Sequence, residues 1–543
     1  MKLPNIVFFL IDDLGYSDVT FTSPPSTSTS ITTTTNTPNI DSLAHHGLVL
    51  DRSYAYKTCT PSRSSFQSGR LPVHVTEQLK VPDNPTAAVP FNMTTITELL
   101  NEQTNYTSHL VGKWDAGLAT TRHTPYGRGY SNSSLSYFSH KNEFYDHTTL
   151  QSGCKTRCET ENPGTHDCIM DLWEGDHPAT SIPQGDFVEH IFRDRALDII
   201  LSESQTPDDP FFLLYSSHIA HCPLQVPQDK LDDFLGQGDD ESHCSAQTAR
   251  VNPDFDDPDK FECRATYKAM VSTLDDIVGT ITESLKENGM YEDTLILFTS
   301  DNGGCVKLDE SGGNNFPLRG GKYSDLEGGV RTAAFAGGGW LESKFGGETG
   351  RRSSEIIHIV DWYATIAALA GIEDGNITDK RAEESTPSLP PIDSRDQRAL
   401  LEGGSSAWEG EPLFLSSNAV MLDDFKLILS PIVAPAGFPG PTYPNASSFL
   451  SPVDDPKLDL NCTNGCLFNI AEDKEEHIDL ASSMPEKVEE LKSMLVEGRK
   501  TFYENSDELV MDCDGDDFEE QNCGCHLAVN KWGGYFGPYA SSP

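Results

Sequence analysis

The chain is poor in basic residues. Its 543 residues include 39 Lys and Arg against 84 Asp and Glu, which gives a formal net charge of −45 and a pI near 4.5. A surface this acidic repels the phosphate backbone of nucleic acids and anionic membrane surfaces. We therefore expect no nucleic-acid partner. An anionic substrate would have to be captured by a locally basic pocket.

Long hydrophobic runs are also missing. No apolar run reaches the roughly 18 residues that a transmembrane helix needs, so the sequence predicts no membrane span. The apolar run Ile6–Ile11 near the N-terminus has no small-residue cleavage site after it, and we interpret it as a buried strand and not as a signal peptide.

The 13 cysteines do not form the two Cys-x-x-Cys knuckles of a structural zinc site. Disulfides in an oxidising compartment are the better interpretation. The chain has six Asn-x-Ser/Thr sequons, which give modest support to the interpretation as a glycoprotein outside the cytoplasm. They lie at Asn92, Asn105, Asn132, Asn376, Asn445 and Asn461. We expect a secreted, extracellular or lysosome-like location, with the signal peptide not seen in this sequence.

Short apolar runs that end in polar residues recur along the chain. They include Ile6–Ile11, Phe211–Tyr215 and Leu295–Phe298. Such runs are typical of strands buried on both faces of a mostly parallel sheet. Between them, the three- and four-residue spacing of apolar residues predicts a helix over Tyr267–Leu285. This alternation of strands and helices predicts an α/β fold.

The C-terminal part of the chain has a different pattern. We predict a catalytic domain over residues 1–378, a linker over 379–410 and a smaller α+β subdomain over 411–543. In that subdomain we expect strands at Ala419–Leu422 and Phe425–Leu429 and a helix at Pro485–Arg499. Its tail, Glu504–Glu520, is strongly acidic, and we expect it to be a solvated surface held by disulfides. The Ser/Thr/Pro tract Ser23–Thr37 is expected to be a surface loop.

Two polar pairs follow predicted buried strands. Asp12-Asp13 ends one strand, and Asp301-Asn302 ends another. Adjacent buried carboxylates are costly unless they bind a cation, and an oxygen-rich set of this kind suits calcium or magnesium. Either pair alone would more often be a turn or a cap.

The segment Cys59-Thr-Pro-Ser-Arg63, followed by Gly69-Arg70, decides the interpretation. It resembles the signature of type I, formylglycine-dependent sulfatases, the arylsulfatase family within the alkaline-phosphatase-like superfamily. Three other segments resemble the metal- and lysine-bearing motifs of that family: Asn5–Gly15, Thr299–Gly304 and Pro317–Lys322. The segment His221–Pro227 resembles arylsulfatase B-type enzymes most.

The resemblance implies a fold and a chemistry. The fold is a large, mixed, mostly parallel sheet sandwiched by helices, with a smaller C-terminal subdomain built on a short antiparallel sheet. The chemistry is hydrolysis of O-sulfate esters, in which a formylglycine-generating enzyme converts Cys59 to formylglycine (3-oxoalanine), and the gem-diol of formylglycine attacks sulfur to form a covalent sulfo-enzyme intermediate. One Ca2+ per chain, with Mg2+ as the alternative, would be bound by Asp12, Asp13, Cys59, Asp301 and Asn302.

The resemblance also implies roles for basic residues. Arg63 would stabilise the attacking hydroxyl, and Lys113 and Lys322 would bind sulfate oxygens. His221 would contact the ester and protonate the leaving alcohol. Where the family has Gly-Lys-Trp-His, this chain has Gly112-Lys-Trp-Asp115. Either Asp115 acts as the base that helps to expel sulfate, or His123 replaces the missing histidine.

Two other functions stay open at this point. A phosphodiesterase or phosphonate hydrolase of the same superfamily would use the same nucleophile. An inactive homologue that binds sulfated glycans would be marked by Asp115. The resemblance favours a sulfated small molecule or glycan as the substrate. Specificity is expected in the tract Ser23–Thr37 and in the long insertion Tyr130–Gly185. Conversion of Cys59 would leave twelve cysteines, enough for six disulfides.

The net charge leads to a prediction about salt. The acidic surface would repel a sulfated substrate, and this repulsion is screened when the Debye length falls below about 10 Å. We expect turnover of an aryl sulfate to hold or rise from low to seawater-like ionic strength, measured as kcat/KM over a salt series. A steep loss over that range would contradict the prediction.

Overall fold

The large sheet has eleven strands, and its middle is parallel. In the computed structural model the described residues are 2–22, 36–79, 89–150, 169–235, 263–306, 312–432, 437–438, 460–505, 510–512 and 523–541. The strands follow the order β11-β2-β10-β8-β1-β7-β3-β4-β5-β6, with β9 paired to β2. Their bounds are β1 Asn5–Ile11, β2 Leu48–Tyr54, β3 Thr107–Lys113, β4 Leu135–Tyr137, β5 Trp173–Glu174, β6 His177–Pro178, β7 Phe211–Ser217, β8 Thr294–Ser300, β9 Arg331–Thr332, β10 Ala334–Gly337 and β11 Arg351–His358.

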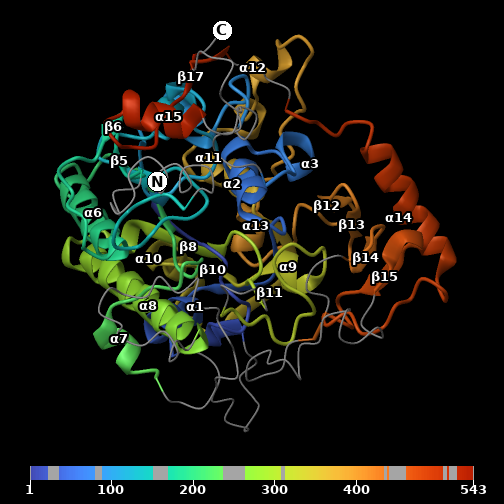
Figure 1. Cartoon of the computed structure of the whole chain (residues 1–543). Helices are drawn as coiled ribbons and strands as arrows, with labels where there is room; N and C mark the ends of the chain where they lie inside the picture. The colour runs from blue at the N-terminus through green and yellow to red at the C-terminus, as the bar shows by residue number, and fades with distance from the viewer. Residues whose placement is uncertain are drawn as a thin grey trace.

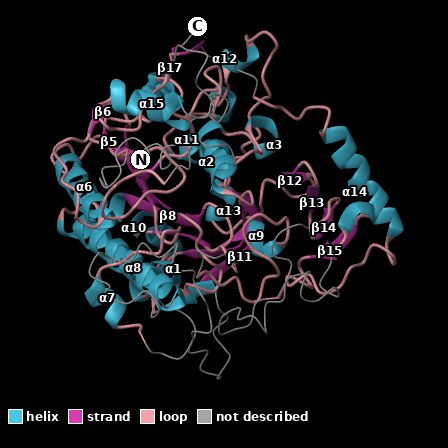
Figure 2. Cartoon of the chain, viewed as in Figure 1, coloured by secondary structure: helices cyan, strands magenta, loops and turns pink. Residues whose placement is uncertain are grey.

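Helices cover both faces of this sheet, because successive side chains of a strand point to opposite faces (Figure 1, Figure 2). Ile6, Phe8 and Leu10 of β1 lie in one apolar core with residues of α2, α4 and α11. Val7 and Phe9 lie in a second core with α1, α6 and α8. These helices are α1 Pro38–His46, α2 Cys59–Ser68, α4 Ile96–Gln103, α6 Val188–Glu203, α8 Cys263–Glu287 and α11 Asp361–Leu369. The α/β prediction is confirmed, with α8 a few residues longer than expected.

The shorter helices lie in the connections between these elements. They are α3 Pro72–Val75, α7 Gln228–Asp232, α9 Glu327–Val330, α10 Gly339–Glu342, α12 Lys380–Glu383, α13 Arg398–Leu401 and α15 Cys523–Asn530. Residues 379–410, expected to be a linker, contain α12 and α13 and pack on the catalytic part. Arg70, for example, forms a buried ion pair of 2.9 Å with Asp379. The domain boundaries themselves stay a prediction.

A second, antiparallel sheet has the order β12-β13-β14-β15. Its strands are Leu413–Ser416, Ala419–Leu422, Phe425–Ile428 and Cys466–Asn469, and α14 (Pro485–Gly498) packs on one of its faces through Val488, Leu491 and Leu495. Sheet and helix lie at the right-hand edge of Figure 1. The predicted short antiparallel sheet and its helix are therefore confirmed. No helix of the described chain is long and apolar enough to cross a membrane.

The end of the chain returns to the large sheet. The amide nitrogen of Tyr539 donates to the carbonyl of Ala119, and the Trp173 indole donates to the carbonyl of Phe536. The two-stranded pair β16 (Val510–Met511) and β17 (Ala540–Ser541) lies in the same region. Most of the acidic tail Glu504–Glu520 and of the tract Ser23–Thr37 lies outside the described residues.

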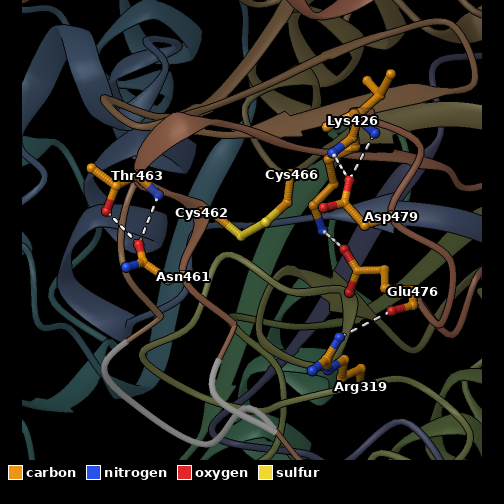
Figure 3. The surroundings of a disulfide bond; sticks show 10 residues. Arg319, Lys426, Asn461, Cys462, Thr463, Cys466, Glu476 and Asp479 are labelled. Atoms are coloured by element: carbon orange, nitrogen blue, oxygen red, sulfur yellow. Dashed lines mark hydrogen bonds and ion pairs between the residues drawn. A yellow bond between two sulfur atoms is a disulfide. The ribbon is translucent and has the colours of Figure 1, made fainter. Parts of the chain in front are cut away.

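The cysteine prediction holds only in part. Cys462 and Cys466 form a disulfide (Figure 3). Cys222 and Cys305 are thiols, so the expectation of six disulfides is wrong at these two positions. The expectation rests only on the even number of cysteines that remain after conversion of Cys59. An even number does not indicate which cysteines come within bonding distance of one another. All five sequons in the described chain have an exposed asparagine, and Asn445 lies outside it.

A buried ion cluster joins the small sheet to the large one. Lys426 of β14 contacts Glu327 of α9 at 2.9 Å and Glu476 at 2.8 Å, and all three side chains are fully buried. Glu476 also accepts the amide hydrogen of Glu327. Burial and the neighbouring Glu327 carboxylate raise the pKa of Glu476 to about 7, against the partial compensation of Lys426.

This cluster predicts how stability depends on pH. Because the pKa of Glu476 is higher in the folded than in the unfolded chain, its contribution is fully present below about pH 4.5 and is lost as pH rises through about 7. We expect the Glu476→Gln substitution to remove about 1–3 kcal/mol of the fall in unfolding free energy between pH 5 and pH 8. Urea unfolding at both pH values measures it. The substitution Glu472→Gln at a nearby exposed position should leave the fall unchanged, and an unchanged fall in Glu476→Gln would refute the prediction.

Candidate functional site

The candidate site lies at the carboxyl-terminal ends of the central parallel strands. Ile11 at the end of β1 is in register with Ser217 of β7 and Ser300 of β8. Asp12 and Asp301 therefore leave the sheet side by side, and Lys113 at the end of β3 follows Gly112, which pairs with Ser216. Ligand sites of open α/β sheets form at this edge.

Two tight backbone conformations shape this edge. Gly112 has φ +106°, and a Cβ there would lie 2.0 Å from the carbonyl oxygen of Ser216, so only glycine lets β3 approach β7 so closely. Asp13 is a non-glycine residue at φ +56°. Its strained turn is held by an amide hydrogen bond to Asp301 and by the Asn302 side chain, which donates to Asp13 Oδ1 at 2.7 Å.

Cys59 is the first residue of α2, and its side chain is buried. The positive end of the helix dipole therefore lies at residue 59, where it favours a negatively charged oxygen. The helix ends at Gly69, which adopts φ +67° and faces the ring of Tyr363. All ten residues of α2 are buried, so the position of residue 59 is held by packing along the whole helix.

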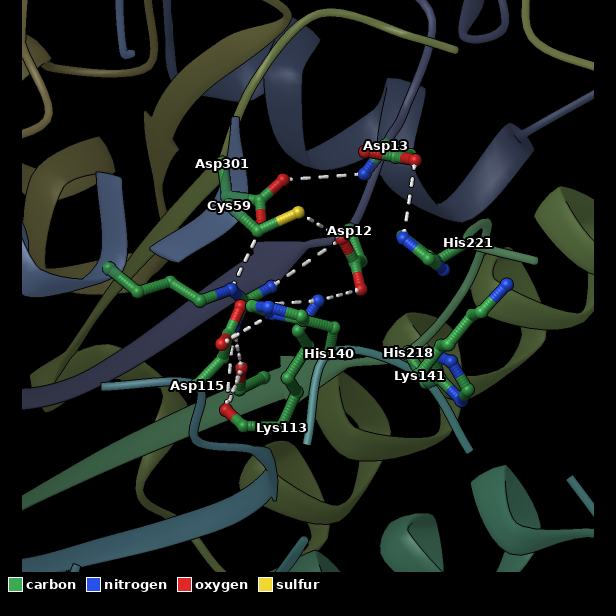
Figure 4. Close-up of polar contacts among 12 residues, drawn as sticks. Asp12, Asp13, Cys59, Lys113, Asp115, His140, Lys141, His218, His221 and Asp301 are labelled. Carbon is green, nitrogen blue, oxygen red and sulfur yellow. Dashed lines mark hydrogen bonds and ion pairs between the residues drawn. The ribbon is translucent and has the colours of Figure 1, made fainter. Parts of the chain in front are cut away.

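Three buried carboxylates at the site each face a buried cation. Asp12 contacts Lys113 at 2.7 Å, Asp13 contacts Lys322 at 2.7 Å, and Asp301 contacts Arg63 at 2.8 Å. Two of these pairs contact Cys59. Its Sγ lies 3.5 Å from Asp12 Oδ1 (Figure 4) and 3.3 Å from Lys322 Nζ. Compensation of this kind is what allows charges to be buried at all.

The pKa values follow from burial and from these cations. Burial raises the pKa of Asp12, but Lys113, Arg63 and Lys322 outweigh it and hold that pKa below its ordinary value. At Asp301 burial dominates and raises the pKa to about 7. Burial also raises the pKa of the Cys59 thiol well above its ordinary value. An unmodified Cys59 is therefore kept neutral and is a poor nucleophile.

The donor set fits a divalent cation. Ligating atoms of Asp12, Asp13, Cys59 and His221 lie within 4.8 Å of one another. Within the described chain, Asn302 Oδ1 is buried and has no hydrogen-bond partner, which fits a ligand oxygen. His221 Nδ1 pairs with the carbonyl of Cys222 at 2.7 Å, so Nδ1 carries the proton and Nε2 faces Asp13 at 3.7 Å. The sequence predicts that His221 contacts the sulfate ester, and it does not predict the position of the ring beside the Asp13 carboxylate.

The structure places the remaining candidates differently. Asp115, at φ +47°, lies 3.6 Å from Lys113 and 2.8 Å from the ring of His140. The ring of His123 stacks on Phe91 and hydrogen-bonds Thr120, so it is engaged elsewhere. The histidine beside Asp115 is thus His140.

Three contacting residues were missed from the sequence: His140, Thr60 and Ser216. Thr60 donates to Asp115, and Ser216 accepts a hydrogen bond of 2.6 Å from Arg63. Thr60 follows Cys59 directly, and Ser216 follows the predicted strand Phe211–Tyr215, so the positions of both residues in the sequence could have indicated that they contact the site. His140 follows β4 in a loop without regular periodicity, so no local pattern marked it.

Comparison with known proteins agrees with this geometry. The sulfatase family profile matches residues 4–372. The chain belongs to the sulfatase family. Three relatives show the range of similarity. Mouse (Mus musculus) arylsulfatase J is 28% identical over 92% of this chain and 76% of its own length. Human arylsulfatase A is 29% identical over 69% of this chain and 66% of its own length. Human N-acetylgalactosamine-6-sulfatase is 27% identical over 68% of this chain, which spans 62% of that relative.

Solved structures show the same fold. Ps i-CgsB in complex with k-i-k-neocarrahexaose has a TM-score of 0.66 and 24% identity, with 93% of this sulfatase and 94% of that chain covered. The phosphonate monoester hydrolase of Agrobacterium radiobacter has a TM-score of 0.53 and 17% identity, with 92% and 95% covered. The alkaline-phosphatase-like fold expected for this sulfatase is confirmed, and the chain is a sulfuric ester hydrolase.

The donor set makes a metal-binding prediction. Asp13→Asn removes a charged oxygen from the cluster, so we expect at least about tenfold weaker Ca2+ binding in calorimetry on protein that retains Cys59. The exposed substitution Asp194→Asn is the matched control and should leave the affinity unchanged. Equal affinity in Asp13→Asn and the wild type would exclude this carboxylate as a ligand.

Proposed function

We propose that this sulfatase hydrolyses O-sulfate esters of a sulfated carbohydrate, with Ca2+ held at Asp12, Asp13, Asp301 and Asn302 and formylglycine formed at Cys59. The observation that carries the proposal is the buried Cys59 at the first turn of α2, within 3.5 Å of Asp12 and Lys322. Burial keeps the Cys59 thiol neutral and therefore a poor nucleophile. Conversion to formylglycine would provide a nucleophilic hydroxyl at the same position. The formylglycine-generating enzyme is the maturation partner that this proposal requires.

The carbohydrate substrate is supported by two named relatives. N-acetylgalactosamine-6-sulfatase acts on a sulfated sugar by its name, and Ps i-CgsB was solved with a neocarrahexaose. The exposed sequons agree with a glycoprotein of a secreted or lysosome-like compartment.

The chain's own residues do most of the chemistry. Hydrated formylglycine supplies the attacking hydroxyl, and the cation polarises the sulfate ester when bound. Lys113 and Lys322 bind sulfate oxygens and offset the negative charge that grows in the transition state. Arg63, held by Asp301 and Ser216, orients the hydroxyl. The tight packing of α2 keeps residue 59 aligned with these groups.

Turnover on two substrate classes tests the proposal. We expect an aryl sulfate to be hydrolysed faster than an aryl phosphodiester, and Cys59→Ala to abolish turnover of both, because the nucleophile is lost. Cys305→Ala is the matched control and should retain activity. Intact-peptide mass spectrometry should find formylglycine at residue 59 of protein from its native source.

Two results would overturn this function. A dominant phosphodiesterase rate would assign the chain to the phosphonate hydrolase type of the superfamily. An unmodified cysteine in native protein without turnover would indicate a binding protein for sulfated glycans. A panel of sulfated polysaccharides and oligosaccharides then identifies the substrate of an active protein.

A further inference from the structure

A histidine pairs with the acid that replaces the family's histidine. His140 lies three residues beyond β4, and its Nδ1 contacts Asp115 Oδ1 at 2.8 Å. The same carboxylate oxygen accepts a hydrogen bond of 3.1 Å from Thr60, the neighbour of Cys59 on α2. In Figure 4, Asp115 and His140 lie beside Lys113. Lys113 Nζ contacts Asp12 at 2.7 Å, and Asp12 in turn lies 3.5 Å from Cys59 Sγ.

His140 and Asp115 each have one buried polar atom that forms no hydrogen bond within the described residues. His140 Nε2 and Asp115 Oδ2 are buried and have no hydrogen-bond partner in the described part of the chain. Buried polar atoms are normally paired, and an unpaired one next to a reactive group is a candidate for contact with substrate or with a transferred proton. The side chain of His140 is 15% exposed, against 2% for Asp115, so the imidazole is also the member that reaches solvent.

Asp115 is a poor proton acceptor by itself. Burial raises its pKa, but His140, Lys113 and Arg63 outweigh burial and lower the pKa to about 2. A carboxylate with this pKa stays charged and does not hold a proton near neutral pH. In the described part of the chain, the Nε2 atom of His140 is buried without a hydrogen-bond partner, so it is the atom of this pair that is open to accept a proton.

We propose that His140, oriented by Asp115, accepts the proton of the residue 59 hydroxyl when sulfate is released, in place of the histidine of the family's Gly-Lys-Trp-His motif. This inference rests on the proposed function. His140 keeps its Nδ1 hydrogen on Asp115 Oδ1 and takes the proton on Nε2. As the O–H bond breaks and the N–H bond forms, the electron pair of the O–H bond forms the C=O bond of the residue 59 aldehyde. The C–O bond to the sulfate group breaks at the same time, sulfate leaves with the electron pair of that bond, and the proton then passes from Nε2 to water. Asp115 is a positioning residue.

The charges around the pair are compatible with an anionic substrate. Asp115 is faced by His140, Thr60, Lys113 and Arg63, and His140 is faced by Asp115 and Thr60. Lys113 and Arg63 attract Asp115, although each of them also pairs with another buried carboxylate, Asp12 or Asp301. The negative charge that Asp115 adds is therefore partly compensated.

Kinetics of His140→Gln test the inference. We expect kcat for an aryl sulfate to fall by about 10²–10⁴-fold with little change in KM, since proton transfer by a positioned group contributes about this factor. The matched control is His177→Gln, an exposed histidine that also pairs with an aspartate, at 3.1 Å, away from the site. A kcat within about threefold of the wild type would overturn the inference.

A second measurement does not depend on turnover. In ¹⁵N-labelled protein that retains Cys59, long-range histidine spectra at pH 8 report which ring nitrogen carries the proton, and the His140 signal is assigned by its loss in His140→Gln. We expect the Nδ1–H tautomer, and we expect Asp115→Ala to populate the other one. An Nε2–H tautomer in the wild type would overturn the inference, because Nε2 then has no lone pair to accept a proton.

Rescue separates a chemical from a structural role. Introducing Asp115→His into His140→Gln returns an imidazole to the position that the family uses, and we expect it to recover kcat at least tenfold over His140→Gln. No recovery, with both variants folded by circular dichroism, would contradict the proposal. Wild-type turnover of the aryl sulfate tests the proposed function by itself, so failure of the His140 inference and failure of the function are distinguishable.

Discussion

The pairing of three buried carboxylates with three buried cations is the interaction on which the site depends. Asp12, Asp13 and Asp301 end adjacent strands, and Lys113, Lys322 and Arg63 reach them from other segments of the chain. Removing one partner of such a pair leaves an uncompensated buried charge, which costs about 3–5 kcal/mol. We propose that the two lysines among these cations also bind sulfate, so the same charges would serve both the stability of the site and the reaction.

The small antiparallel sheet takes part in this arrangement from a distance. Lys426 of β14 forms buried ion pairs with Glu327 and Glu476. Glu327 is the first residue of the short helix α9, which follows the segment that contains Lys322. A buried ion cluster therefore links the C-terminal subdomain to the helix that follows the Lys322 segment. Figure 3 shows Lys426 and Glu476 of this cluster. Lys322 of the linked segment contacts Cys59.

Asp115 is the position at which this chain departs from the family's Gly-Lys-Trp-His motif. An acid at this position would repel a sulfate. Burial raises the pKa of Asp115, but His140, Lys113 and Arg63 outweigh burial, lower this pKa to about 2 and partly compensate the charge. His140 then brings back an imidazole from another segment. The requirement at this place is a proton acceptor of suitable basicity, and two residues from different loops can meet it together as well as one histidine can.

The sequence by itself determined the class of the protein. The buried runs that precede Asp12 and Asp301 predicted the sheet, and the resemblance carried by the signature at Cys59 implied the reaction, because strand ends and short motifs are local patterns. The metal ligands implied by the same resemblance stay a prediction. Tertiary structure alone decided that His140 meets Asp115, that His221 faces Asp13 and that Cys222 and Cys305 are thiols. These facts depend on the paths of loops and on distances between residues far apart in the chain, which neither periodicity nor cysteine parity encodes.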